Sequence, residues 1–161
     1  MQEFLTIGLI GTALMLLTSA VVYETLAVLW ERLPRMRVGR RRIAVVIGAI
    51  FIAHIVCIWI YGVAFYWLMH HLDVGGFEGA SIADGNYGTD LFSMVYYSTV
   101  TYTSLGYGDI VPTRGFRFLA GIEVLNGLVL IGWTVSYAFI AMQKFWKFSD
   151  AASLSHEQSH R

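Results

Sequence analysis

Charge is scarce in this chain, because Asp, Glu, Lys and Arg make up only 14% of its 161 residues. Soluble domains carry about a quarter of such residues, so the composition is a poor fit to a globular protein in water. The formal net charge of zero gives no electrostatic reason to expect nucleic acid as a partner. The single cysteine, Cys57, excludes an internal disulfide framework. With 57% hydrophobic residues, the composition is typical of a membrane protein in a lipid bilayer.

Three apolar runs are long enough to cross about 30 Å of hydrocarbon as helices, at about 1.5 Å per residue. They are Phe4–Trp30, Ile43–Met69 and Phe116–Phe145. A fourth run, Leu91–Thr103, is too short to cross, and Thr89 is a suitable residue to cap it. We therefore expect three membrane spans and one short helix that enters the membrane without crossing it.

Lysine and arginine are missing altogether from residues 43–113, whereas six arginines lie between the first two apolar runs. Because basic residues concentrate in cytoplasmic loops, the arginine-rich segment is predicted to be cytoplasmic. The N-terminus and residues 71–115 are then outside, and the C-terminus is in the cytoplasm. The same arginines predict contact with anionic lipid headgroups; they are Arg32, Arg35, Arg37, Arg40, Arg41 and Arg42.

Motifs for catalysis are absent as well. The sequence has no glycine-rich nucleotide-binding loop and no nucleophile with a base at a useful spacing. His54 and Cys57 share one face of the predicted second helix, but two ligands do not make a metal site. We therefore predict neither an enzyme nor a protein with a cofactor.

Two glycines instead flank a tyrosine in a short run, Thr101–Asp109, which reads Thr-Tyr-Thr-Ser-Leu-Gly-Tyr-Gly-Asp. Glycine enters left-handed dihedral angles at no steric cost, so it suits backbone whose carbonyls must all point one way. The core of the run, from Ser104 to Gly108, resembles the selectivity filter of potassium channels, in which carbonyl groups from four chains replace the water shell of the ion. The order of elements also matches that family's pore domain: an apolar span, an external loop, a short helix, this run and a returning span.

The resemblance covers roughly Ile43–Trp146 and implies an all-α membrane protein. Three transmembrane helices, a re-entrant pore helix and a selectivity-filter loop would form the pore of a homotetramer. The implied divisions are an added helix with the arginine-rich loop (1–42), the pore domain (43–147) and a polar cytoplasmic tail (148–161). Within the pore domain they are the outer helix (43–70), external loop (71–89), pore helix (90–103), filter (104–109) and inner helix (116–147).

The family also suggests a role for each residue of the filter. Potassium, the permeant ion, would bind to the carbonyl groups of Ser104, Leu105, Gly106 and Tyr107 and to the Ser104 hydroxyl, with Gly108 completing the filter. Side chains of Leu105 and Tyr107 would point back toward the pore helices. The residues expected to support the filter are Asp109, Tyr96, Tyr97, Thr103 and Glu123.

Two departures from the family pattern affect the filter. Ser104 and Leu105 stand where the family usually has threonine and valine, and Ser104 lacks the methyl group that stiffens the side chain, which favours softer ion selectivity. Tyr96 and Tyr97 stand where tryptophans are common. A Tyr97 hydroxyl that donates to Asp109 is our expectation for how the acid is held.

The inner helix carries two features with two interpretations each. Gly127 lies where channel inner helices have a hinge, but a small residue there equally suits close helix packing. Leu128, Ile131, Val135 and Phe139 recur at spacings of three and four and form one apolar stripe. This stripe would either close the pore by dewetting or pack against neighbouring helices.

Glu123 lies about two turns inside the last span, where a carboxyl group needs a partner. The partners we consider are Asn126, hydroxyls of the pore helix such as those of Thr99 or Tyr102, and Arg117. We expect Glu123 to act as a strut behind the filter.

The sequence therefore predicts a potassium-selective channel subunit of a plasma (inner) membrane, with potassium passing through a tetrameric pore. Two alternatives remain open: a weakly selective channel for monovalent cations, and a non-conducting subunit that regulates or scaffolds another protein.

Overall fold

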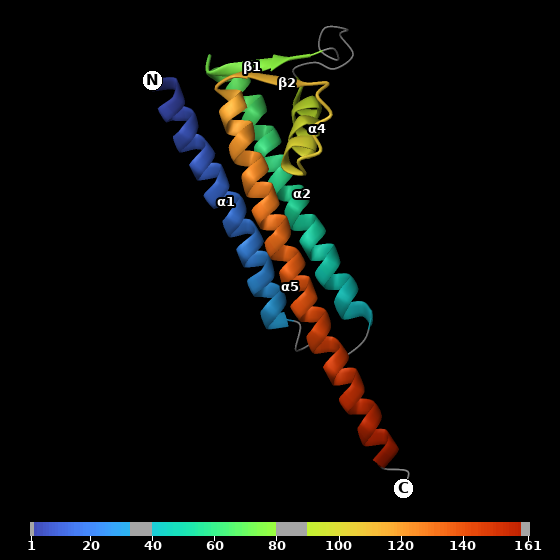
Figure 1. Ribbon diagram of the computed structural model, residues 1–161. Helices are drawn as coiled ribbons and strands as arrows, with labels where there is room; N and C mark the ends of the chain where they lie inside the picture. Colours follow the sequence, from blue (N-terminus) through green and yellow to red (C-terminus); the bar gives the residue numbers. More distant parts are fainter. Residues whose placement is uncertain (1, 33–39, 80–89, 159–161) are drawn as a thin grey trace.

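The computed structural model describes residues 2–32, 40–79 and 90–158, and it is mostly helical (Figure 1). Among these residues, three helices are long and apolar enough to cross a membrane. A short helix lies beside the upper half of one of them, and two short strands lie at the same end (Figure 1). The elements are α1 (Gln2–Arg32), α2 (Arg40–His71), β1 (Gly75–Glu78), α4 (Leu91–Tyr102), β2 (Val111–Arg114) and α5 (Phe116–Gln158). The predicted all-α channel fold is confirmed.

All three long helices extend beyond the predicted apolar runs, and the extensions of α2 and α5 change the predicted divisions of the chain. α2 begins at Arg40, so Arg40, Arg41 and Arg42 belong to its first turn and not to a loop. α5 continues to Gln158, so most of the segment expected as a polar tail is helical, and it extends beyond the ends of α1 and α2 (Figure 1). Arg35 and Arg37 lie outside the described residues.

The external loop is more ordered than the expected irregular segment. Its residues Gly75–Glu78 form strand β1, which pairs antiparallel with β2 in a register that places Gly75 opposite Arg114 and Glu78 opposite Val111. Gly79 ends this pairing with φ 145°, and a Cβ there would lie 2.1 Å from the Asp109 carbonyl oxygen. Only glycine allows this approach. Gly79 therefore lies directly against Asp109, the last residue of the predicted filter (residues 104–109, here called the filter run). The rest of the predicted loop, 80–89, is outside the described residues.

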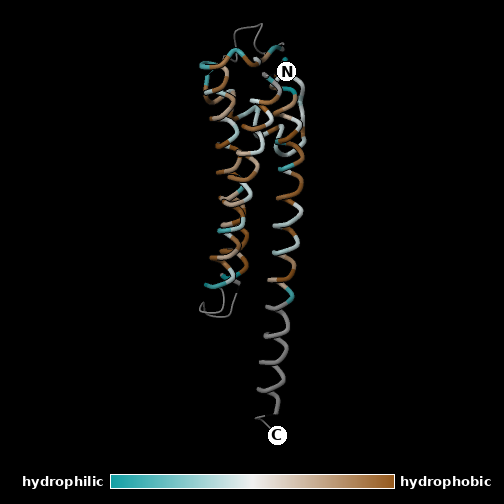
Figure 2. Tube along the Cα trace, turned by 90° about the vertical axis from the view of Figure 1, so that its left-hand side faces the viewer, coloured by the Kyte–Doolittle hydropathy of each residue, from teal (hydrophilic) through white to brown (hydrophobic). Residues whose placement is uncertain are grey.

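Apolar residues predominate along the membrane-spanning stretches of the three long helices, as expected of membrane spans (Figure 2). α1 packs against α2 and α5, and α4 packs against α2 and α5 on another side. Gly62 of α2 lets α4 come close, because a Cβ there would lie 2.8 Å from Val95 Cα. The arrangement holds α4, and the run that follows it, against two membrane spans.

An aromatic cluster fixes the outer end of this bundle. Phe65 of α2, Phe77 of β1, Tyr97 of α4 and Phe116 of α5 meet with ring centroids 4.6–5.6 Å apart. Most of these pairs meet edge to face, a geometry that contributes about 0.5–1.5 kcal/mol beyond area burial. Four elements are therefore locked together immediately behind the filter run.

Candidate functional site

The short helix α4 begins at an acidic cap. Asp90 is the N-cap residue, and its carboxylate accepts hydrogen bonds from the backbone N–H groups of Phe92 and Ser93. Thr89, the expected cap, is outside the described residues, and Asp90 lies before the helix and not in its first turn. The Ser93 hydroxyl also donates to this carboxylate, and these bonds lower the pKa of Asp90 below its usual value. An ionised acid at this end is favoured by the helix dipole.

At its other end α4 runs directly into the filter run through a Schellman motif. The Leu105 N–H donates to the Val100 carbonyl at 2.8 Å, and the Ser104 N–H donates to the Thr101 carbonyl at 2.9 Å. This pattern requires a left-handed residue just beyond the helix, a position that is usually glycine. Here it is Ser104, with φ 55°. A left-handed non-glycine residue costs about 1–2 kcal/mol, and the two hydrogen bonds hold Ser104 in place.

Left-handed residues recur at every second position of the filter run. Ser104 has φ 55°, Gly106 has φ 54° and Gly108 has φ 78°. In an ordinary strand, successive residues face opposite sides. A change of handedness at alternate residues turns successive carbonyl groups toward one side instead. The backbone of this run is thus suited to offering a row of carbonyl oxygens to a cation.

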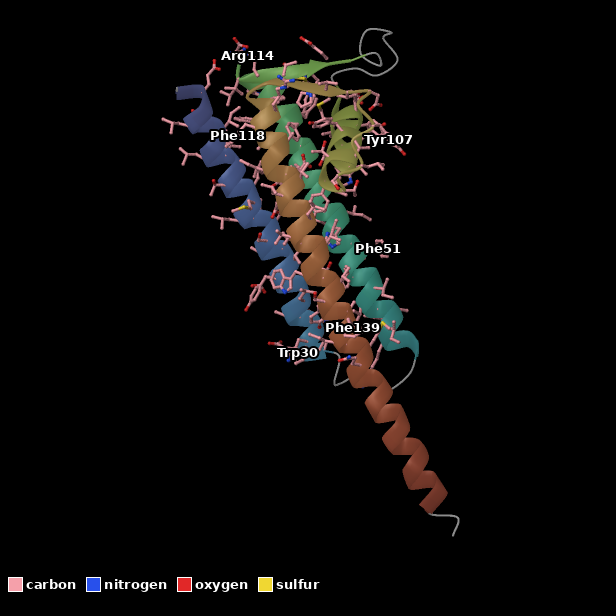
Figure 3. All side chains as sticks on the ribbon, viewed as in Figure 1. Trp30, Phe51, Tyr107, Arg114, Phe118 and Phe139 are labelled. Carbon is pink, nitrogen blue, oxygen red and sulfur yellow. The ribbon has the colours of Figure 1, made fainter. Side chains whose placement is uncertain are left out.

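The same run is uncovered within a single chain. Leu105 is 57% exposed and Tyr107 is 68% exposed, and Figure 3 shows Tyr107 at the outer edge of the molecule beside α4. Residues 103–108 are all exposed. Large apolar side chains of this kind mark a contact surface when they gather in one place. Their own chain therefore leaves Leu105 and Tyr107 largely uncovered, and the expectation that they point toward the pore helices of an assembled pore stays a prediction.

Asp109, which ends the run, is held by a tyrosine, but not by the one that the sequence suggested. The Tyr96 hydroxyl donates to Asp109 Oδ2 at 2.9 Å. The expected Tyr97 donor is wrong, because the Tyr97 ring lies in the aromatic cluster between Phe65 and Phe77. Successive residues of a helix point about 100° apart, so only one of the two can face Asp109. Asp109 Oδ1 is buried and has no partner among the described residues.

Glu123 is fully buried, and its partner is a hydroxyl of α4, the type of partner expected, but on a residue that had not been named. The Ser98 hydroxyl is hydrogen-bonded to Glu123 Oε1 and also lies 2.9 Å from the Ile58 carbonyl oxygen. Ser98 is on α4, Ile58 on α2 and Glu123 on α5, so this contact joins three helices. None of the four suggested partners forms this bond. The contact lies behind the filter run, which is the place expected for a strut.

Gly127 packs directly against the end of α4. A Cβ at this position would lie 2.2 Å from the Tyr102 carbonyl oxygen and 3.0 Å from the carbonyl carbon. These are backbone atoms, which cannot move aside as a side chain can. Close packing, one of the two interpretations of Gly127, is therefore present in this structure, while a hinge stays a prediction.

The apolar stripe of the inner helix is mostly exposed. Leu128 is 50%, Val135 is 63% and Phe139 is 58% exposed, whereas Ile131 packs partly against the buried core. The first three are free to face an axis or a neighbouring chain. Ile131 packs against the core of its own chain, so it is less suited than the other three residues to line a pore.

Several residues that build the site were not identified from the sequence. Gly62, Ser98 and Phe65 position α4, but each is an ordinary small or apolar residue in a span or a short helix. Ser98 gave one signal, since it lies on the buried face of α4 between Met94 and Tyr102 and carries a hydroxyl that must find a partner in hydrocarbon.

Comparison with known proteins supports the same interpretation. No curated protein and no solved structure matches the chain. A family model described as "Ion channel" matches residues 53–144, from the middle of α2 through α4 and the filter run into α5. Since the match covers more than half of the chain and includes both spans around the re-entrant helix, the chain belongs to the two-span, pore-loop ion channel family.

Proposed function

We propose that this chain is a subunit of a potassium-selective channel, and that four copies surround one pore through which potassium passes passively. The observation that carries the proposal is the run 104–108, in which left-handed residues alternate at the end of a re-entrant helix. The carbonyl oxygens of Ser104, Leu105, Gly106 and Tyr107 would replace the water shell of the ion.

Other features of the site support cation conduction. The carbonyl end of α4, where the helix dipole is negative, would point toward the pore axis and attract a cation. Asp109 would raise the local concentration of cations at the outer mouth. The exposed Leu105 and Tyr107 would be covered by neighbouring copies, so the site is incomplete in one chain. Leu128, Val135 and Phe139 would line the inner part of the pore.

We further propose a plasma (inner) membrane as the location, with the N-terminus outside and the C-terminus in the cytoplasm. The arginines near the inner ends of α1 and α2 support this orientation, and they would contact anionic lipid headgroups there.

The test is a flux assay with purified protein in liposomes, with potassium and sodium compared under equal gradients. We expect potassium flux well above sodium flux, and none from Gly106→Asp, which puts a charged side chain into a left-handed glycine position. Equal fluxes of the two ions would indicate the weakly selective channel instead. No flux of either ion from intact oligomers would contradict the proposal and favour a non-conducting subunit.

A further inference from the structure

Helix α1 lies outside the residues that match the ion channel family, yet it reaches deep into the buried part of the bundle. Thr18, at its middle, is fully buried. The Asn126 side-chain amide of α5 donates to Thr18 Oγ1 at 2.7 Å and lies 3.2 Å from the Tyr61 hydroxyl of α2. This three-helix polar contact, formed by Thr18, Tyr61 and Asn126, joins the middle of α1 to α2 and α5.

Glycines allow α1 to lie close to α5. A Cβ at Gly11 would lie 2.6 Å from Ile122 Cδ1, and a Cβ at Gly115 would lie 2.2 Å from Ile7 Cδ1. Small residues at such contacts are typical of helices that associate inside a membrane, where no hydrophobic effect drives them together. α1 is therefore packed as a component of the bundle and not as a loose addition.

The three-helix polar contact lies next to the place where α5 supports the filter. Asn126 directly precedes Gly127, whose Cα faces the Tyr102 carbonyl at the end of α4. Glu123, one turn away on α5, is hydrogen-bonded to Ser98 of α4. A helix held from one side by α1 and from the other by α4 has little freedom to rotate or slide at this level.

We propose that Thr18 is a positioning residue for the ion pathway: through Asn126 it fixes α5 against α4 and thereby sets how often the pore conducts. The proposal rests on the proposed channel function. It predicts that the Thr18 hydroxyl changes the open probability without changing the filter itself, because Thr18 is separated from the filter run by α5.

The test uses the full chain in planar bilayers, with open probability, single-channel conductance and reversal potential measured together. Thr18→Val removes the hydroxyl and keeps the shape, and Thr18→Ser restores the hydroxyl. The matched control is Thr12→Val, because Thr12 is exposed on the same helix and its hydroxyl donates only to the Gly8 carbonyl of α1. Asn126→Leu removes the other side of the contact.

We expect Thr18→Val to change the open probability roughly three- to twenty-fold, the range that interhelical hydrogen bonds in membranes would produce. Conductance and reversal potential stay unchanged, and Thr18→Ser and Thr12→Val behave like the wild type. Asn126→Leu shifts the open probability in the same direction, and the double variant shifts it no further. An unchanged open probability in Thr18→Val, or additive effects in the double variant, would overturn the proposal.

A second readout needs no ion flux. Cys57, the chain's only cysteine, is fully buried, and its thiol lies 3.7 Å from the Thr18 carbonyl oxygen. Labelling by a membrane-permeant maleimide therefore reports whether α1 stays in place, even if the channel proposal itself fails. We expect faster labelling in Thr18→Val and wild-type labelling in Thr12→Val; equal labelling in both would contradict docking through Thr18. Should Thr18→Val not assemble, Thr18→Ala and Thr18→Ser, which differ by the hydroxyl alone, decide the same question.

Discussion

The two sides of the filter run differ sharply within one chain. Behind it, Ser98, Glu123 and the aromatic cluster around Tyr97 are buried and tied to three helices. In front of it, residues 103–108 are exposed, and the large side chains of Leu105 and Tyr107 have little cover.

This difference separates what one chain can build from what it leaves to others. A single copy supplies the helix, the left-handed backbone and the support behind them. The front remains open, although non-helical backbone at membrane depth is tolerated only where protein or a watery cavity encloses it. The predictions below change contacts behind the filter run or the cap of α4 and leave the exposed front unchanged, in decreasing order of expected effect.

The largest effect is expected where α5 touches the end of α4. Gly127→Ala would place a methyl group against the Tyr102 carbonyl and push the two helices apart, with a loss of about 1–3 kcal/mol in stability. Thermal unfolding of the assembled protein in detergent measures this loss. Gly121→Ala on the same helix is the control, because open space surrounds that position. Equal stability of the two variants would show that α5 and α4 are not in close contact.

The second largest effect is expected from removal of the Ser98 hydroxyl. Ser98→Ala leaves Glu123 Oε1 buried without its hydrogen-bond partner, which costs about 1–3 kcal/mol. Both oligomer stability and ion flux are expected to fall. Ser136→Ala is the matched control, since the Ser136 hydroxyl is exposed and donates only to the Gly132 carbonyl of its own helix. If both variants keep full stability and flux, Glu123 is not a strut.

Substitutions of the two tyrosines of α4 are expected to differ clearly in how fast the current decays. Tyr96→Phe removes the donor to Asp109, a change of about 0.5–1.5 kcal/mol, and is expected to speed the decay of current during sustained conduction. Tyr97→Phe keeps its ring in the aromatic cluster and leaves the hydrogen bond between Tyr96 and Asp109 intact. Its current should therefore decay as in the wild type. Current recordings from the two variants under one protocol make the comparison. Faster decay in Tyr97→Phe alone would contradict the geometry.

The smallest effect concerns the cap of α4 and appears only in acid. The pKa of Asp90 is lowered by its hydrogen bonds with Ser93, so the ionised cap stabilises the folded state fully above the unfolded pKa of about 3.9. This contribution is lost as the pH falls through the lower, folded pKa. Asp90→Asn, an equally good cap, should match the wild type at neutral pH and show a weaker fall in stability below about pH 4. Identical acid unfolding profiles would remove this role.

The number and kind of helices could be predicted from the sequence, because each depends on length or charge summed over many residues. The three spans and the re-entrant helix are of this kind. The filter run was identified from its resemblance to the filter motif of potassium channels, and its two glycines lie at positions where the backbone is left-handed.

Contacts between helices could not be predicted in the same way. The Asp109 donor was assigned to Tyr97 instead of Tyr96, since the rotation of α4 depends on how Phe65 and Phe77 pack around Tyr97. Likewise, β1 was missed because four residues of Gly-rich sequence carry no period, and the strand exists only through pairing with β2.

The central claim is that several copies together cover the front of the filter run. Electron cryomicroscopy of the purified full-length protein in a lipid nanodisc tests it most directly. We predict fourfold symmetry, with the carbonyl groups of residues 104–107 around the axis, density for ions between them, and Leu105 and Tyr107 buried against neighbouring copies of α4. A monomer, or an oligomer in which Leu105 and Tyr107 face lipid away from any axis, would contradict the account.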